Sequence, residues 1–171
     1  MISSWALPPD VLQALDDRLA ELKPGLAVES GSGESTLVLA RHSEKVVSFE
    51  HDHSWAKHVH RRFTEEGQPI SHVSVIRTRI VSTDTPAGPL PWYNAPSPKG
   101  IDFALIDGPP CRIGRGAAGY QIIPNMNPDG EIWVDDYGDS PHYKQVRAWV
   151  RLWQKTYDFD IQDRGRYAIL R

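Results

Sequence analysis

The sequence of 171 residues predicts an α/β protein, in which a mostly parallel sheet lies between two layers of helices and carries an antiparallel hairpin at its C-terminal edge. Three observations predict this class. Strand-like apolar runs alternate along the chain with stretches of helical period. The run 101–107, IDFALID, is apolar almost throughout, which is typical of a strand buried on both faces. Two short β-like runs flank Arg164-Gly165-Arg166 at the end of the chain and favour a terminal hairpin.

The helices are justified by their apolar spacing and their first residues. Pro8 and Pro9 suit a first helical turn, where the missing N–H would be unpaired anyway. The apolar residues that follow, Val11, Leu12, Leu15, Leu19 and Leu22, recur at helical spacing, so residues 1–25 are expected to form an N-terminal helical cap. Further helices are expected from about Ser35, after a cap at Asp52 or His53, and after Ser140-Pro141.

The strands follow the same reasoning. Short apolar runs predict strands at 26–28, 45–50, 101–107 and 131–136, and alternation of apolar residues predicts another at 73–81. Residues 159–162 and 167–170 form the closing hairpin. A helix should connect the third and fourth strands, but residues 83–100 contain five prolines between Pro86 and Pro98, so no helix can run there. We expect a long irregular loop in its place.

Composition narrows the class of protein further. The length suits one domain over 1–171, and 19 Lys and Arg against 22 Asp and Glu give a net charge of −3, which argues against a nucleic-acid partner. No apolar run is long enough to cross a membrane. The one cysteine, Cys111, cannot form an intrachain disulfide, and the N-terminus has no evident signal peptide. We therefore expect a cytoplasmic protein.

A glycine turn follows the first strand, and an acid ends the second. In the stretch ESGSGEST, residues 29–36, the glycines let the backbone pass close to a ligand, and the helix that follows aims free N–H groups at it. Glu50 lies where a carboxylate can accept hydrogen bonds from a ribose diol. The dinucleotide pattern G-x-G-x-x-G has Thr36 in place of its third glycine, which counts against a dinucleotide. Alternatively, the glycines only make a tight turn, and Glu50 is a solvated capping carboxylate.

These motifs resemble those of class I S-adenosylmethionine-dependent methyltransferases. The resemblance includes E-x-G-x-G-x-S with Glu50, IDGPP after the fourth strand, DGEIWVDDY at the fifth and the closing hairpin, and it extends over 26–171. It implies a three-layer Rossmann-like methyltransferase sheet and S-adenosylmethionine as cofactor, with Glu50 on the ribose hydroxyls and His51 beside the adenine. The cofactor-binding residues that it implies are Glu29, Gly31, Ser32, Gly33, Ser35, Thr36, Glu50, His51 and Asp107.

Three carboxylates end the fourth and fifth strands. Asp107 and the pair Asp135-Asp136 should lie at neighbouring strand ends, an arrangement that suits Mg²⁺. Their placement is similar to the metal-dependent catechol O-methyltransferase-like branch, which implies a metal and catalytic role for all three. Two features depart from that branch: no lysine follows Asp107 closely, and consecutive strand residues point to opposite faces, so the pair can share a metal only if the strand has ended. Alternatively, these acids cap loops.

Other candidate residues lie in the loops. His142 near the fifth strand is a candidate general base or an exposed histidine, and Cys111 lacks an evident base and is treated as incidental. Arg112 and Arg115 either contact an anionic acceptor or hold their loop. Trp92 and Tyr93 either cover the adenine or acceptor, or pin the proline-rich loop to the sheet. The other histidines are expected on solvated helix faces.

The sequence therefore predicts methyl transfer from S-adenosylmethionine to a hydroxyl or amine of a small molecule, with Mg²⁺ as an optional assistant. The predicted catalytic residues are Asp107, Asp135, Asp136 and His142. Two alternatives stay open: a nucleotide-dependent oxidoreductase or epimerase, and a non-catalytic binding module with the same fold. A homodimer could complete the acceptor pocket.

Overall fold

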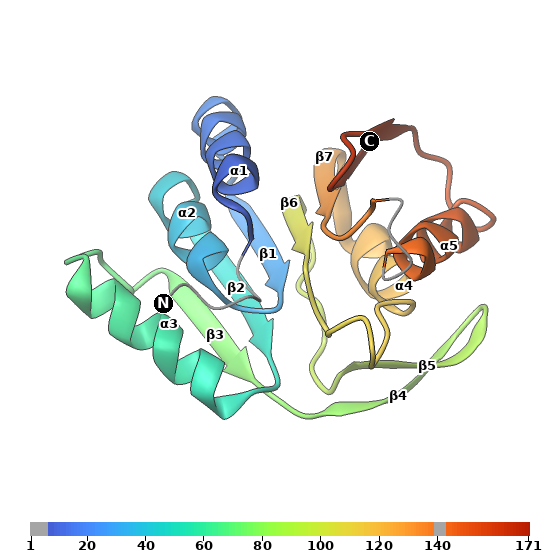
Figure 1. Ribbon diagram of the computed structural model, residues 1–171, viewed down its shortest axis with the longest axis horizontal. Coiled ribbons are helices and arrows are strands. Elements are labelled where there is room, and N and C mark those ends of the chain that lie inside the picture. The colour runs from blue at the N-terminus through green and yellow to red at the C-terminus, as the bar shows by residue number, and fades with distance from the viewer. Residues whose placement is uncertain (1–6, 139–142) are drawn as a thin grey trace.

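The computed structural model describes residues 7–138 and 143–171 and confirms the predicted fold class (Figure 1). Within these ranges, the central sheet has the strand order β3-β2-β1-β6-β7-β9-β8. The strands β3, β2, β1, β6 and β7 run parallel, whereas β9 is antiparallel to both β7 and β8. The bounds of the strands are β1 Leu26–Ser30, β2 Lys45–Glu50, β3 Val73–Arg77, β6 Ile101–Ile106, β7 Met126–Val134, β8 Ile161–Asp163 and β9 Ala168–Leu170.

Helices cover both faces of the sheet (Figure 1). The helices α1 (Pro9–Leu22), α2 (Glu34–His42) and α3 (His53–Glu65) pack on one face, and α4 (Ala118–Ile122) and α5 (Lys144–Trp153) on the other, with a 3₁₀ turn at Ile123–Asn125. Each face has its own apolar core, because consecutive strand residues point in opposite directions. Thus Ala27 packs with the α1–α3 core and Val28 with the α4–α5 core.

Most predicted elements are present, but the strand predicted at 131–136 is β7, which begins at Met126 and ends at Val134, and the short helix α4 was not predicted. The side chain of Asp52 caps α3 by accepting hydrogen bonds from the backbone N–H groups of Ser54 at 2.7 Å and Trp55 at 3.2 Å. The cap predicted at Ser140-Pro141 lies outside the described residues, and α5 is described from Lys144. None of the described helices has the length and apolar character needed to cross a membrane.

The prediction for residues 73–100 was partly wrong. The third strand ends at Arg77 instead of continuing to Val81, and a hairpin of β4 (Ile80–Thr85) and β5 (Gly88–Tyr93) replaces the irregular loop. Pro89 and Pro91 lie two residues apart in β5, so their backbone nitrogens point to the same edge of the strand. In a two-stranded ribbon, one edge of each strand has no neighbouring strand, and proline is tolerated there because no N–H donor is needed. The expectation that no helix forms here is confirmed.

The strand order also places the functional site. The chain steps outward from β1 through β2 to β3 and then returns to pair β6 with the other side of β1. The order therefore reverses between β1 and β6, and in open α/β sheets ligands bind beyond the carboxyl ends of the strands at this point. The turn after β1 and the loop after β6 meet there.

Candidate active site

The turns after β1 and β6 touch each other through two glycines. Gly31 has a positive φ of 88°, and a Cβ on it would lie 3.0 Å from the backbone nitrogen of Gly108. A Cβ on Gly108 would lie 2.9 Å from Gly31 Cα and 2.5 Å from the hydroxyl oxygen of Tyr93. Real Cβ atoms essentially never come as close as a Cβ on Gly108 would. A Cβ on Gly31 would be tighter than nine in ten real contacts and would lie on left-handed backbone, so both positions favour glycine. The predicted glycine turn therefore has a definite purpose, which is to let the two loops pass at backbone distance.

Glu29 supports the glycine turn from behind. Its carboxylate is fully buried and accepts hydrogen bonds from the hydroxyl groups of Ser35, Thr36 and Ser48, the last two at 2.6 Å. Burial raises the pKa of Glu29 to about 7. Glu29 and Thr36 are not among the described residues that line the cavity below, so their predicted contact with the cofactor stays a prediction.

Glu50 ends β2 and ties it to the glycine turn. One oxygen, Oε2, accepts the backbone N–H of Ser32 at 3.0 Å, and the other, Oε1, accepts those of His51 at 2.6 Å and Asp52 at 2.7 Å. The carboxylate is nearly buried but borders the cavity. A carboxylate has about four acceptor positions, so Oε2 keeps capacity for a further donor such as a ribose hydroxyl.

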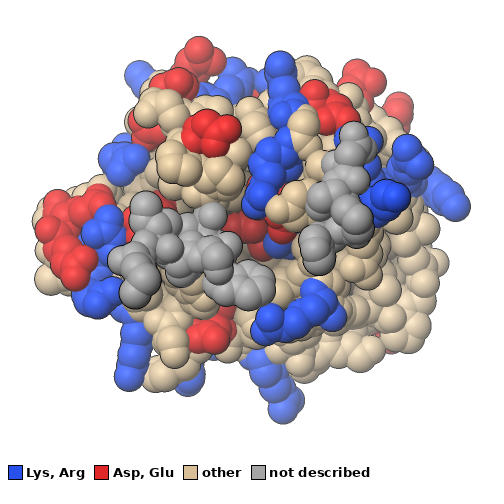
Figure 2. Space-filling view, viewed as in Figure 1, with Lys and Arg blue, Asp and Glu red and all other residues tan. Residues whose placement is uncertain are grey.

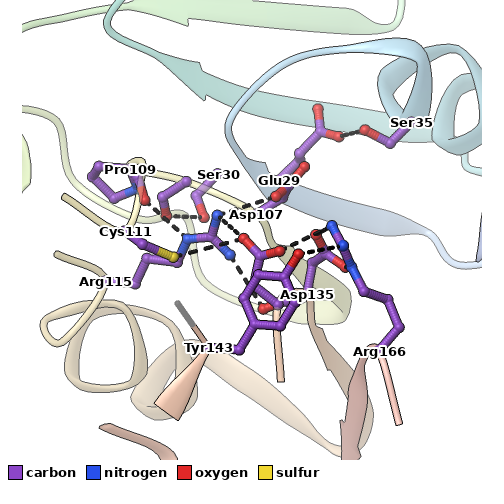
Figure 3. A network of polar contacts seen from close by, with 12 residues as sticks. Glu29, Ser30, Ser35, Asp107, Pro109, Cys111, Arg115, Asp135, Tyr143 and Arg166 are labelled. Carbon is purple, nitrogen blue, oxygen red and sulfur yellow. Dashed lines mark hydrogen bonds and ion pairs between the residues drawn. The ribbon is translucent and has the colours of Figure 1, made fainter. Parts of the chain in front are cut away.

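The three predicted acids converge at the ends of β6 and β7, where Figure 3 shows Asp107 and Asp135. Ligand oxygens of Asp107, Asp135 and Asp136 lie within 4.8 Å of one another. The strand ends at Val134, and Asp136 has a positive φ of 61°, which turns its side chain to the same region as that of Asp135. The geometric condition for a shared site, that the strand has ended before the acid pair, is thus met.

Arg115 lies among these acids. Only 4% of its side chain is exposed, and it makes four hydrogen bonds. Nε donates to the carbonyl oxygen of Pro109 at 2.9 Å and Nη1 to that of Asp135 at 3.2 Å. Nη2 donates to carboxylate oxygens of Asp107 at 3.3 Å and of Asp136 at 3.0 Å. The expectation that Arg115 holds its loop fits these contacts, which also extend to the acids.

Arg166 approaches the cluster from the closing hairpin. Its Nε and Nη2 donate to the two carboxylate oxygens of Asp135, each at 3.1 Å, and Nη2 lies 2.9 Å from Asp136 Oδ1. Nη1 donates to the hydroxyl of Tyr143 at 2.6 Å. A backbone hydrogen bond of 2.8 Å from Tyr137 to the carbonyl of Arg166 holds this turn beside the end of β7. A residue 31 positions from Asp135 thus completes the cluster.

Burial and mutual repulsion perturb the acids. Desolvation raises the pKa of Asp107 well above its usual range, the charge of Asp135 adds to this effect, and Arg115 opposes it. Burial also raises the pKa of Asp135, against the hydrogen bonds from Arg166. Burial likewise raises the pKa of the Cys111 thiol, whose sulfur lies 3.6 Å from Asp136 Oδ2. A raised thiol pKa disfavours the thiolate, in keeping with an incidental role for Cys111.

The donor set of the three acids would suit Mg²⁺, but the present arrangement fits the ion poorly. Two guanidinium groups already occupy carboxylate oxygens that an ion would need. Mg²⁺ also demands nearly ideal octahedral geometry, which leaves little room for a guanidinium among its ligands. The predicted metal site therefore stays a prediction.

One cavity of about 560 Å³ joins the glycine turn to the acid cluster. It contains most of the predicted cofactor residues and all three acids: Gly31, Ser32, Gly33, Ser35, Glu50, His51, Asp107, Asp135 and Asp136. His142 lies outside the described residues. Pro110 of the IDGPP stretch also lines the cavity. Four lining residues that reach it from distant parts of the chain were not predicted as site residues, namely Leu7, Trp55, Tyr143 and Arg166. Leu7, Trp55 and Tyr143 lie outside the motifs, and Arg166 lies in the turn of the closing hairpin, whose position beside the acids the sequence did not indicate.

The β4–β5 hairpin supplies Tyr93 to the same cavity. The ring is 2% exposed and stacks on Phe49 with a centroid distance of 5.8 Å, yet its hydroxyl has no hydrogen-bond partner among the described residues. Trp92, beside it, lines a smaller cavity of about 240 Å³, and its buried ring N–H also has no partner in the part of the chain that the structure describes. Trp92 and Tyr93 therefore pin the hairpin to the sheet, and Tyr93 in addition faces the main cavity.

Comparison with solved structures places this geometry in a known fold. The methyltransferase PaMTH1 of Podospora anserina, solved with S-adenosylhomocysteine, superposes with a TM-score of 0.74 at 13% identity, over 98% of this chain and 80% of that one. The O-methyltransferase of Bacillus cereus, also solved with S-adenosylhomocysteine, gives 0.69 at 13% identity over 99% and 84%. The chain has the fold of the class I S-adenosylmethionine-dependent methyltransferases. No protein-family model matches the sequence, and no curated protein matches it.

The class I fold does not by itself choose an acceptor. An rRNA methylase of Streptococcus thermophilus shares the fold with a TM-score of 0.62 at 18% identity, over 99% of this chain and 96% of that one. Proteins with very different acceptors thus share this sheet. On the face drawn in Figure 2, acidic and basic side chains are interspersed. The choice of acceptor depends on the residues that line the cavity.

Proposed function

We propose that this protein transfers the methyl group of S-adenosylmethionine to a hydroxyl or amine of a small molecule. One observation carries the proposal: a single cavity joins a glycine turn and a strand-end acid to a cluster of acids at the neighbouring strand ends. A methyl donor held at the first place and an acceptor held at the second would meet near Gly31 and Gly108. Catalysis of such a transfer consists mainly of alignment, because the donor sulfur is already activated.

The glycine-turn end would hold the cofactor. Glu50 has acceptor capacity at Oε2 for a ribose hydroxyl, and its two oxygens are fixed by backbone N–H groups, so it needs no rearrangement on binding. His51 borders the same space, with Nδ1 3.0 Å from Glu50 Oε1. The carboxylate of Glu50, whose described donors are neutral N–H groups, faces the cavity and favours a positively charged sulfonium there.

The acid-cluster end would hold the acceptor. The acceptor oxygen or nitrogen forms a bond to the methyl carbon with its lone pair, the carbon–sulfur bond breaks, and sulfur keeps that electron pair. The acceptor proton passes to a base. Asp107 is our candidate, because it borders the cavity and its raised pKa makes it a better proton acceptor than an ordinary aspartate. His142 as a base, assistance by Mg²⁺, a homodimer and a cytoplasmic location stay predictions.

Binding of S-adenosylhomocysteine, measured by titration calorimetry, tests the proposal. We expect saturable binding to the wild-type protein and at least about tenfold weaker binding to Glu50→Gln, which loses about one charge-assisted hydrogen bond. Glu44→Gln, an exposed position at the start of the same strand region, is the matched control and should bind as the wild type does. No binding of S-adenosylhomocysteine, together with binding of a nicotinamide dinucleotide, would instead favour the oxidoreductase alternative.

A second assay separates an enzyme from a binding module. Methyl-labelled S-adenosylmethionine is incubated with phenols, aliphatic alcohols, primary amines and an RNA transcript, and label is counted in each acceptor. Transfer to a small molecule and not to RNA is the expected result. A protein that binds S-adenosylhomocysteine but transfers label to none of these acceptors would be better described as a binding module.

A further inference from the structure

The acid cluster already contains two positive charges, which come from distant parts of the chain (Figure 3). Three carboxylates face two guanidinium groups, and each acid has at least one guanidinium nitrogen within 3.3 Å. Clustered buried carboxylates repel one another unless cations or hydrogen-bond donors neutralise them. In this protein the neutralising cations are side chains.

The two arginines differ in how firmly they are fixed. Arg166 is 33% exposed in its side chain and could turn toward solvent, whereas Arg115 is held by the carbonyl groups of Pro109 and Asp135 as well as by two carboxylates. The loop that carries Arg115 is anchored in turn by a hydrogen bond of 2.7 Å from the Trp153 indole to the carbonyl of Gly116. To admit a metal ion, the protein would have to expel a buried guanidinium from four acceptors, and a buried charge without partners is costly.

We propose that Arg115, supported by Arg166, is the resident cation of this cluster, so that the protein binds its ligands without a divalent ion. The proposal rests on the proposed function, because it assigns the cluster to the acceptor end of that cavity. Arg115 acts here as a positioning residue: it fixes the carboxylates of Asp107 and Asp136 and carries the charge that a metal would otherwise supply. Without a metal, the acceptor needs no pair of adjacent oxygens to chelate.

Metal titration tests the proposal directly. The wild-type protein is treated with a chelator, dialysed, and titrated by calorimetry with Mn²⁺ and with Mg²⁺. We expect no saturable binding of either ion in the millimolar range, and S-adenosylhomocysteine should bind with the same affinity in EDTA as in Mg²⁺. Saturable micromolar binding of either ion to the wild type, or loss of S-adenosylhomocysteine affinity in EDTA, would overturn the proposal.

The variant Arg115→Gln provides the reciprocal test. It removes the buried cation and leaves three carboxylates, so we expect Mn²⁺ to bind at least about tenfold more tightly than to the wild type and to raise the thermal midpoint of the variant. A folded Arg115→Gln protein that binds Mn²⁺ no better than the wild type would count against the proposal, because a merely structural arginine would lower the midpoint without creating metal affinity. Arg151→Gln, an exposed position on α5, is the control for the lost charge.

A second variant, and metal titrations that are independent of cofactor binding, keep the test decisive. If Arg115→Gln does not fold, Arg166→Gln removes the more exposed cation and should show the same gain of Mn²⁺ affinity to a smaller degree, and an unchanged affinity there would oppose the proposal. The metal titrations do not depend on cofactor binding. A protein without affinity for S-adenosylhomocysteine would contradict the proposed function, while its metal titration would still decide whether arginine replaces the ion.

Discussion

Buried carboxylates lie at both ends of the cavity, and the groups that neutralise them differ between the first end, at the glycine turn, and the second end, at the acid cluster. At the glycine turn, Glu29 is surrounded by hydroxyl groups and Glu50 by backbone N–H groups, all of them neutral donors. At the acid cluster, the donors are the guanidinium groups of Arg115 and Arg166. Neutral donors leave a negative potential that suits a sulfonium, whereas cations cancel the charge of the acids. The same type of side chain thus prepares one end for a positive ligand and the other for proton transfer.

The largest expected effect comes from removing a cation from the second end. Arg115→Gln should lower the free energy of unfolding by about 3–5 kcal/mol, because it leaves buried carboxylates without their partner. Chemical denaturation at pH 7 measures this, and Arg151→Gln should change the same quantity by less than about 0.5 kcal/mol. A loss below about 1 kcal/mol at Arg115 would mean that the acids are neutralised in another way.

At the first end, the glycine turn, the free energy of unfolding should depend on pH because of Glu29. Burial raises the folded-state pKa of Glu29 to about 7 from a usual value of 4.5, so the folded state binds the proton more tightly than the unfolded state. Stability therefore falls as pH rises from about 4.5 to about 7, by about 3 kcal/mol in total for this one group. Denaturation of the wild type and of Glu29→Gln at several pH values isolates the contribution. Equal pH dependence in both proteins would show that neutral donors do not leave Glu29 perturbed.

The contact between Gly31 and Gly108 should give a smaller change in the free energy of unfolding when it is disturbed. Gly31→Ala places a Cβ in left-handed backbone and 3.0 Å from Gly108, so it should destabilise the protein by about 1–3 kcal/mol and weaken binding of S-adenosylhomocysteine. Gly67→Ala is the matched control, because Gly67 also has a positive φ of 63° but has no atom within 4 Å of the added Cβ. The excess cost at Gly31 measures the close approach itself, and equal costs would show that backbone strain alone explains both.

Tyr93 should give the smallest change in stability. Its hydroxyl is buried without a described partner, so Tyr93→Phe should alter the free energy of unfolding by less than about 1 kcal/mol. If the hydroxyl contacts a ligand in the cavity, binding of S-adenosylhomocysteine or of an acceptor weakens about three- to tenfold. Tyr157→Phe, outside the cavity lining, is the control. Unchanged ligand affinities would leave Tyr93 as a packing residue of the hairpin.

The sequence predicted the contacts at the glycine turn better than those at the acid cluster. The reason is the number of residues that separate the contacting side chains along the chain. The partners of Glu29 and Glu50 lie within 19 residues and belong to one strand–turn–helix–strand unit, so a local motif describes them. Asp107, Asp135 and Asp136 were also predictable, because each follows an apolar run that had to be a strand. Arg166 was not, since its place depends on how the terminal hairpin pairs with β7.

The hairpin of β4 and β5 shows a second kind of limit. Five prolines correctly excluded a helix, but they do not distinguish an irregular loop from a two-stranded ribbon with one free edge. The alternation of Val73 to Val81 continued smoothly past Arg77, although the strand leaves the sheet there. Pattern alone does not reveal where a strand changes partners, so the sequence did not decide whether Tyr93 covers a ligand or pins the proline-rich segment to the sheet.

The contact between Gly31 and Gly108 has a thermodynamic consequence. The turn that would receive a cofactor and the loop that would receive an acceptor share one wall of backbone, so neither can be displaced without moving the other. A ligand that shifted one of these loops would therefore change the affinity of the other half for its own ligand, and linkage requires the two factors to be equal. Such coupling would pass through backbone, at a contact between two residues that have no side chain.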